Sequence, residues 1–147
     1  MDDLKIALYS PEYLDGLASL INQWGMPKAY TAEALASDLE RVLVRDEYRI
    51  YLALSGENVV GYAQTSDKHL LCFDPFVEIE QLLVDENCRS AGVGTALMSR
   101  IEHYALERGI AMVKLSSQVH RTRAHLFYER MGYEYFKISK FYEKKIK

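Results

Sequence analysis

The chain has 147 residues, of which 49% are hydrophobic and 27% are charged, and its formal net charge is −3. This length suits one globular domain, expected over residues 1–147, and the weak negative charge argues against nucleic acid as the main partner. The acidic start Met1-Asp2-Asp3 precedes no long apolar run, so we expect neither a signal peptide nor a membrane span. The two cysteines, Cys72 and Cys88, then favour a reducing compartment, which predicts a cytoplasmic protein.

The first half of the sequence predicts one strand, two helices and a hairpin. Leu4 to Tyr9 alternates apolar and polar residues, which is typical of a strand with one buried face. Ser10 before Pro11 has the pattern of a capped helix start, and Thr31 is expected to cap a second helix. The elements expected next are a strand at Tyr48–Leu54, a turn at Gly56–Asn58, a return strand at Val59–Thr65 and a loop at Ser66–Pro75.

The second half predicts strands that alternate with helices. Apolar residues at helical spacing run from Val93 to Ala105, and Gly109 lies where a helix C-cap is expected. The order predicts an α+β fold of three layers, with a mixed, mostly antiparallel central sheet and helices on both faces. The expected elements are a strand at Phe76–Val84, this long helix, a strand at Ile110–Leu115, a helix at Arg121–Met131 and a last strand at Tyr133–Phe141.

The turn between the Phe76–Val84 strand and the long helix has the features of an anion site. Helix starts expose free N–H groups at the positive end of the helix dipole, and glycines let a phosphate approach the backbone. Gly92 and Gly94 lie at this start, and Arg89 adds a positive charge. The dinucleotide fingerprint would need a third glycine where this chain has Leu97. On spacing alone, the glycines are equally compatible with a simple helix cap.

Two motifs resemble those of the GCN5-related N-acetyltransferases. One is Arg89-x-x-Gly92-x-Gly94 after Leu82-Leu-Val84-Asp-Glu, and the other is Ala124-His-Leu-Phe-Tyr128-Glu-Arg-Met-Gly132-Tyr133. The resemblance covers the last half of the chain and implies an acyl-CoA N-acyltransferase-like fold. Many members carry Asn where this chain has Arg121, so that role is not carried over. The resemblance assigns to the coenzyme Leu82, Leu83, Val84, Arg89, Ser90, Ala91, Gly92, Val93, Gly94 and Thr95.

The resemblance also implies a reaction. Acetyl-CoA would be the co-substrate, without a metal, and a primary amine would attack its thioester directly in a ternary complex. The acceptor would be a small-molecule or peptide amine, with neither nucleic acid nor membrane as partner. Dimers are common in the family, and residues 133–142 offer an edge for a homodimer. Acidic residues near the expected acceptor side would suit a cationic amine: Asp67, Asp74 and Glu78.

The strand Phe76–Val84 has two interpretations. One extra residue near Glu80-Gln81 would bring Val77, Ile79, Leu82 and Val84 to one face, as a β-bulge does. The resemblance implies such a bulge, beside which the strand backbone binds the pantetheine arm. The alternative is an unbroken strand with Glu78 and Glu80 both facing solvent.

Three residues are candidates for the chemistry. An ammonium with a pKa near 10.4 must lose a proton before it attacks, and a carboxylate can accept that proton. Glu80 is preferred over Glu78 as this base, because it matches the position of a frequent acid in the resembling family. Tyr128 is the candidate acid for the departing thiolate. Cys88 beside Arg89 would offer a covalent route, which we do not favour because no histidine lies near it in sequence.

Two other functions remain open. The chain would serve as a non-catalytic acyl-CoA sensor if the fold were kept without turnover. It would be a nucleotide-phosphate-binding domain if the turn bound phosphate for another purpose. The sequence does not identify the acceptor amine.

Overall fold

The computed structural model describes residues 3–147, which form two compact units. The first unit ends at Ser116 and the second contains residues 117–147. Met1 and Asp2, part of the acidic start used above, lie outside the described residues. In the part of the chain that is described, no helix is long and apolar enough to cross a membrane. The expected organisation as a single domain stays a prediction.

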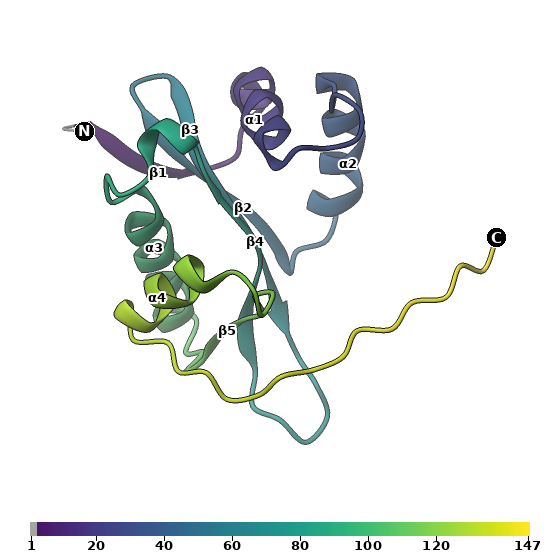
Figure 1. Ribbon diagram of the computed structural model, residues 1–147, viewed down its shortest axis with the longest axis vertical. Helices are drawn as coiled ribbons and strands as arrows, with labels where there is room; N and C mark the ends of the chain where they lie inside the picture. The colour runs from purple at the N-terminus through teal and green to yellow at the C-terminus, as the bar shows by residue number, and fades with distance from the viewer. Residues whose placement is uncertain (1–2) are drawn as a thin grey trace. The chain divides into compact units, whose positions relative to one another are not determined.

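A five-stranded sheet in the order β1-β2-β3-β4-β5 forms the centre of the first unit (Figure 1). Neighbouring strands are antiparallel, except that β4 and β5 are parallel. This confirms the mixed, mostly antiparallel sheet predicted from the element order. The strands are β1 (Leu4–Leu8), β2 (Tyr48–Ser55), β3 (Asn58–Lys68), β4 (Phe76–Val84) and β5 (Val113–Leu115).

Two helices, α1 (Leu14–Ile21) and α2 (Ala32–Leu43), cover one face of this sheet. Thr31 caps α2 as predicted, because its side chain accepts a hydrogen bond from the Ala34 N–H at 3.1 Å. Ser10 occupies an N-cap position and Pro11 begins the helical turn as predicted, but this turn is a 3-10 helix and the Ser10 hydroxyl donates to Glu12 Oε1 at 3.0 Å instead of capping a backbone N–H. The core on this face comprises Leu17, Ala18, Leu20, Ile21, Leu35, Leu39, Ile50, Leu52, Leu54, Val59, Tyr62 and Leu83.

The helix α3 (Val93–Glu107) packs against the opposite face. A Cβ built on Gly61 of β3 would lie 2.8 Å from Val93 Cγ1 and 3.2 Å from Leu97 Cδ1, so helix and strand approach closely there. Val93, Leu97, Met98 and Ile101 are at most 1% exposed. The first unit therefore has helices on both faces of the sheet, as predicted.

Two strand boundaries differ from the predictions. β3 continues to Lys68, which pairs with Phe76, so the predicted loop at 66–75 is shorter. Polar side chains persist in this strand because each of Ser66, Asp67 and Lys68 has a partner. β5 is only Val113–Leu115, three residues shorter at its start than expected.

The second unit contains the helix α4 (Thr122–Arg130). Gly132 ends it with a left-handed φ of 92°, as predicted. The strand predicted at Tyr133–Phe141 is wrong, because residues 133–147 form no strand. Alternation indicates a strand only where a partner strand supplies hydrogen bonds, and Tyr135, Phe136 and Ile138 all have exposed side chains instead.

Candidate active site

A β-bulge interrupts the pairing of β3 and β4 at Glu80. Gln81 lies opposite Gln64 and Ile79 lies opposite Thr65, so Glu80 is the extra residue. The predicted bulge is therefore confirmed. Residues opposite each other share a face, and Gly61, the partner of Val84, faces α3. The register accordingly places Val77, Ile79, Leu82 and Val84 on the α3 face.

Beyond the bulge, β4 has an open edge. Among the described residues, β5 pairs only with Val77, Glu78 and Ile79. The Asp85 N–H donates to the Val60 carbonyl at 2.8 Å, so alternate residues of β4 point their backbone groups toward β3. The backbone groups of Leu82 and Val84 therefore face the open edge. Leu83 instead faces β3, opposite Tyr62, and its side chain lies in the core.

The open edge leads into a turn and the start of α3. Asp85 caps a short 3-10 helix by accepting from the Asn87 N–H at 2.9 Å. Ser90 and Gly92 then take left-handed φ angles of 66° and 84°. The first turn of α3 has no side-chain cap and no acidic residue, so its free N–H groups and dipole favour an anion. Arg89, Ser90, Ala91, Gly92 and Thr95 are exposed.

The two candidate bases lie together on the face covered elsewhere by α1 and α2. Ser66 Oγ donates to Glu80 Oε1 at 2.6 Å. Lys68 Nζ lies 3.2 Å from the same oxygen and 3.4 Å from Glu78 Oε2. Burial lowers the pKa of Lys68, but hydrogen bonds to and charges of Glu80 and Glu78 outweigh burial, and the pKa is raised. Lys68 therefore stays an ammonium group between two carboxylates.

An aromatic pair extends this polar surface along β3 and β4. Tyr62 OH donates to Gln81 Oε1 at 2.9 Å, and the Tyr62 ring lies 5.7 Å from that of Trp24. Burial raises the pKa of Tyr62, so the hydroxyl stays a donor. Trp24 is 40% exposed. Residues Tyr62, Ser66 and Lys68 share one side of β3, because side chains two apart in a strand point the same way.

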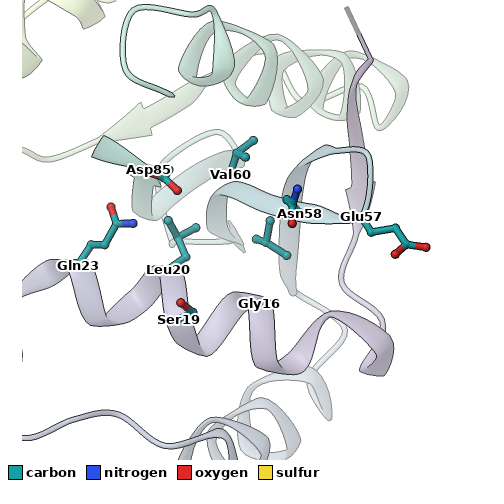
Figure 2. Close-up of a pocket in the computed structure, with 9 residues that line it drawn as sticks. Gly16, Ser19, Leu20, Gln23, Glu57, Asn58, Val60 and Asp85 are labelled. Atoms are coloured by element: carbon teal, nitrogen blue, oxygen red, sulfur yellow. The ribbon is translucent and has the colours of Figure 1, made fainter. Parts of the chain in front are cut away.

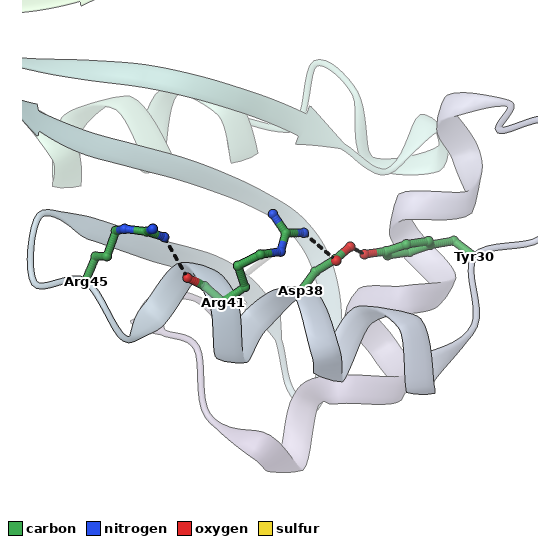
Figure 3. A network of polar contacts seen from close by, with 4 residues as sticks. All are labelled: Tyr30, Asp38, Arg41 and Arg45. Atoms are coloured by element: carbon green, nitrogen blue, oxygen red, sulfur yellow. Dashed lines mark hydrogen bonds and ion pairs between the residues drawn. The ribbon is translucent and has the colours of Figure 1, made fainter. Parts of the chain in front are cut away.

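The loop that carries Trp24 is closed by one amide side chain. Asn22 Oδ1 accepts from the Tyr30 N–H at 2.7 Å, and Asn22 Nδ2 donates to the Tyr30 carbonyl at 3.0 Å. The Tyr30 hydroxyl donates to Asp38, which also pairs with Arg41 at 2.5 Å (Figure 3). Arg45 donates to the Arg41 carbonyl at 3.0 Å. These contacts fix the loop on α2, beside the aromatic pair.

Asp67 lies in β3 and not in the exposed loop that the sequence predicted. Its side chain is 9% exposed, and Oδ2 accepts from Tyr104 OH at 2.7 Å and from Arg49 Nη1 at 3.3 Å. Arg49 also stacks on the Tyr104 ring at 4.0 Å. Asp67 therefore joins β3 to α3, while Asp74 and Glu78 keep partly or fully exposed positions.

Cys88 is a poor candidate for a covalent route. Burial raises the pKa of its thiol, and the charge of Asp85 raises it further. The effect of Arg89 expected from the sequence does not dominate. A thiol with a raised pKa is less often the reactive thiolate that a covalent route requires.

Tyr128 lies on α4 in the second unit and is half-buried. Its ring meets that of Tyr133 edge-on at 6.4 Å and that of Phe127 at 5.4 Å. Burial raises the pKa of Tyr128, against a smaller opposing effect of the Arg121 charge. The hydroxyl is therefore protonated throughout the neutral range, as an acid must be before it acts. Its catalytic role stays a prediction.

A separate cavity of about 370 Å³ lies between α1 and the hairpin of β2 and β3 (Figure 2). None of the predicted site residues lines it. Gln23 and Asp85 lie at one end, where Gln23 Oε1 accepts from the Glu86 N–H at 3.0 Å. The cavity's lining residues are Gly16, Ser19, Leu20, Gln23, Glu57, Asn58, Val59, Val60 and Asp85.

Two residues of the glutamate cluster, Ser66 and Lys68, were not predicted as site residues, because both fall in the segment that was expected to be a loop. The signal available was the spacing of Tyr62, Gln64, Ser66 and Lys68, which puts four side chains capable of hydrogen bonding on one side of a strand. Polar residues at strand spacing are equally typical of a loop, so only the pairing with β4 distinguishes the two.

Curated relatives of the chain are N-acetyltransferases. Aminoalkylphosphonate N-acetyltransferase of Salmonella typhimurium is 29% identical over 124 residues, 76% of this chain and 80% of that protein. An uncharacterized N-acetyltransferase of Methanocaldococcus jannaschii, MJ1207, is 40% identical over 57 residues. That match covers 39% of this chain and only 25% of the length of MJ1207.

Solved structures share the fold. An aminoglycoside N-acetyltransferase, AAC(6')-Iy, in complex with CoA is 20% identical, with a TM-score of 0.82 over 97% of this chain and 95% of that one. A Trypanosoma brucei acetyltransferase is 19% identical, with a TM-score of 0.82 over 97% of this chain and 100% of that one. A sequence model described as the Acetyltransferase (GNAT) family matches residues 13–133. The chain therefore belongs to the GNAT family of acetyltransferases.

Proposed function

We propose that the protein transfers an acetyl group from acetyl-CoA to a primary amine, by direct attack in a ternary complex. The observation that carries this proposal is the open edge of β4, which runs from the bulge at Glu80 into the uncapped start of α3. An extended ligand with an anionic end fits such an edge, because strand backbone and helix N–H groups bind its two parts.

The coenzyme would lie along this edge. Leu82 and Val84 would bind the pantetheine arm through backbone groups, with Leu83 holding the strand in the core. The pyrophosphate would bind the turn and the first residues of α3, from Arg89 to Thr95, which carry no opposing acidic side chain. The Leu82 N–H, directed to the open edge, would donate to the thioester oxygen as it gains negative charge.

The acceptor would approach the face that carries Glu78 and Glu80. Acetyl-CoA supplies the acetyl group as a thioester, and a carboxylate takes the proton from the attacking amine. Glu80 at the bulge is the proposed base, with Glu78 as the alternative. Tyr128 is the proposed acid that protonates the departing thiolate, a role for which its protonated hydroxyl has the proton to give.

Two carboxylates, Glu78 and Glu80, lie on the face that the acceptor would approach and would favour an amine with a positive charge. Lys68 contacts both of them, and Lys114 lies opposite Glu78. The relatives act on aminoalkylphosphonates and aminoglycosides, which are small molecules with amino groups. We therefore propose a small-molecule amine as the acceptor, with a lysine peptide as the alternative.

A screen of amines with detection of released CoA thiol tests the proposal. The panel contains an aminoalkylphosphonate, an aminoglycoside, a polyamine and a lysine peptide. The expected result is acetyl-CoA-dependent release with at least one amine. E80Q should lower kcat about 100-fold or more, whereas E78Q should lower it much less. A larger loss in E78Q would assign the base to Glu78 instead.

A non-catalytic acyl-CoA sensor is the competing function. It would bind acetyl-CoA in calorimetry and release no thiol with any amine of the panel. Transfer by the wild type, lost in E80Q while acetyl-CoA still binds, would exclude the sensor.

A further inference from the structure

Glu80 is held from the neighbouring strand through one oxygen of its carboxylate. Oε1 accepts from Ser66 Oγ at 2.6 Å and lies 3.2 Å from Lys68 Nζ. Within residues 3–147, no hydrogen-bond partner is found for Oε2. Ser66 is 1% exposed, so its hydroxyl has little freedom to turn to water. The carboxylate is thus fixed by one oxygen and leaves the other available.

Glu78 is held differently. It lies in the regular part of β4, opposite Ser66, and its Oε2 lies 3.4 Å from Lys68 Nζ. Its contribution is a second negative charge that keeps Lys68 in place. The two glutamates are therefore unequal: Glu80 has two donors and sits on the bulge, while Glu78 has one.

We propose that Ser66 and Lys68 are positioning residues for acetyl transfer, holding Glu80 Oε1 so that Oε2 receives the proton of the acceptor amine. This inference rests on the proposed function. As the nitrogen–carbon bond forms and the carbon–sulfur bond of the thioester breaks, the amine proton moves to Oε2, directly or through one water. The thiolate leaves with a proton from the proposed acid.

Charge supports the same arrangement. Ser66 and Lys68 of β3 contact Glu80, and Lys68 also contacts Glu78. Lys114 of β5 lies opposite Glu78, and its Nζ lies 4.3 Å from the centre of the Phe76 ring. Because Lys68 contacts both carboxylates, its positive charge offsets the repulsion between them.

Steady-state kinetics test the role. S66A should lower kcat about tenfold, because a hydrogen bond to a charged group is lost, while the KM for acetyl-CoA stays constant. K68M should lower kcat, because Glu80 Oε1 loses its contact with the ammonium group. K68R, which keeps the charge, should restore most of this loss. The matched controls K5M and S99A replace exposed residues on β1 and α3 and should match the wild type.

Combining S66A and K68M with E80Q distinguishes a positioning role from a general loss of structure. If Ser66 and Lys68 act through Glu80, then S66A and K68M should change kcat little once Glu80 is Gln. Equal losses in both backgrounds would overturn the inference. Unchanged kcat in S66A and K68M, in an enzyme that transfers acetyl groups, would overturn it as well.

A spectroscopic measurement distinguishes failure of the inference from failure of the proposed function. In protein labelled with ¹³C at glutamate side chains, the Glu80 carboxyl signal is the one lost in E80Q. It should move in S66A and in K68M but not in K5M. No movement overturns the inference, whatever the activity. Movement without transfer to any amine overturns the proposed function and, with it, the catalytic role of these contacts.

Discussion

Gly92 has a left-handed backbone, with φ of 84°, at the start of α3, although a Cβ there would meet no atom within 4 Å. Backbone conformation, and not space, is therefore what requires glycine. A side chain in this region costs about 1 kcal/mol or more. The N–H groups that the proposed function assigns to the pyrophosphate follow directly after this residue.

G92A should therefore lower stability by about 1 kcal/mol and weaken acetyl-CoA binding about tenfold, because relief of the strain turns the N–H groups away. Calorimetric titration and thermal unfolding measure the two effects. G109A is the matched control, since Gly109 has φ of 70°, equally open surroundings and lies just beyond the other end of α3. An equal loss of affinity in G109A would contradict the assignment.

Part of the candidate site could be predicted from residue types alone, and part could not. Glu78, Glu80 and the glycine turn were recognisable, because acidic residues and glycines are informative beside a strand and a helix start. Ser66 and Lys68 were not, since their role depends on which residues of β4 lie opposite them. A register shift of one residue at Glu80 decides that pairing, and it is a tertiary property.

At the scale of elements, the position of α3 depends on the absence of a side chain at Gly61. A Cβ there would also lie 3.3 Å from the Leu83 carbonyl, so the strand cannot shift to make space for a side chain. Gly16 plays the same part for α1, where a Cβ would lie 2.9 Å from Val59 Cγ2. One glycine thus sets the distance of a helix on each face.

We expect both G61A and G16A to lower the free energy of unfolding by about 1–3 kcal/mol, because each overpacks a helix against the sheet. Only G61A should weaken acetyl-CoA binding, since it displaces the helix whose start is the proposed anion site. Urea unfolding and calorimetric titration compare the two. Equal affinities in the variants would show that the position of α3 is not what shapes the site.

Helices and strands were predicted correctly where their bounds depend on residues within the element or next to it. β4 was predicted with its observed bounds, and Thr31 caps α2 as expected. The predictions failed where a partner decides the outcome: β3 extends through three polar residues that find partners across the sheet, and the alternating residues 133–141 form no strand. Hydrophobic alternation is a property of one segment, whereas a strand forms only when a second segment pairs with it.

At the scale of the whole molecule, two tyrosines make the free energy of unfolding depend on pH in the alkaline range. Burial, and then the hydrogen bond to Asp67, raises the pKa of Tyr104 to about 12. Burial and the hydrogen bond to Asp38 raise the pKa of Tyr30 to about 12. In the unfolded chain these groups titrate near 10. Their contribution is therefore complete below about pH 10 and is lost as the pH rises toward 12.

The free energy of unfolding should accordingly fall between about pH 10 and 12, by about 1–2 kcal/mol for each tyrosine. Y104F should be less stable than the wild type at neutral pH, because Asp67 loses a donor, yet its stability should fall less steeply in alkali. Urea unfolding at a series of pH values measures both. A slope identical to that of the wild type would contradict the assignment to Tyr104.

The bulge at Glu80 also affects how readily another strand could pair with this edge of the sheet. A sheet edge with free backbone groups invites another chain to add a strand, which is a common start of aggregation. Past Ile79, β5 no longer protects β4, but the extra residue breaks the regular spacing that an incoming strand would need. The irregularity that presents Glu80 thus also makes this edge a poor template for self-association.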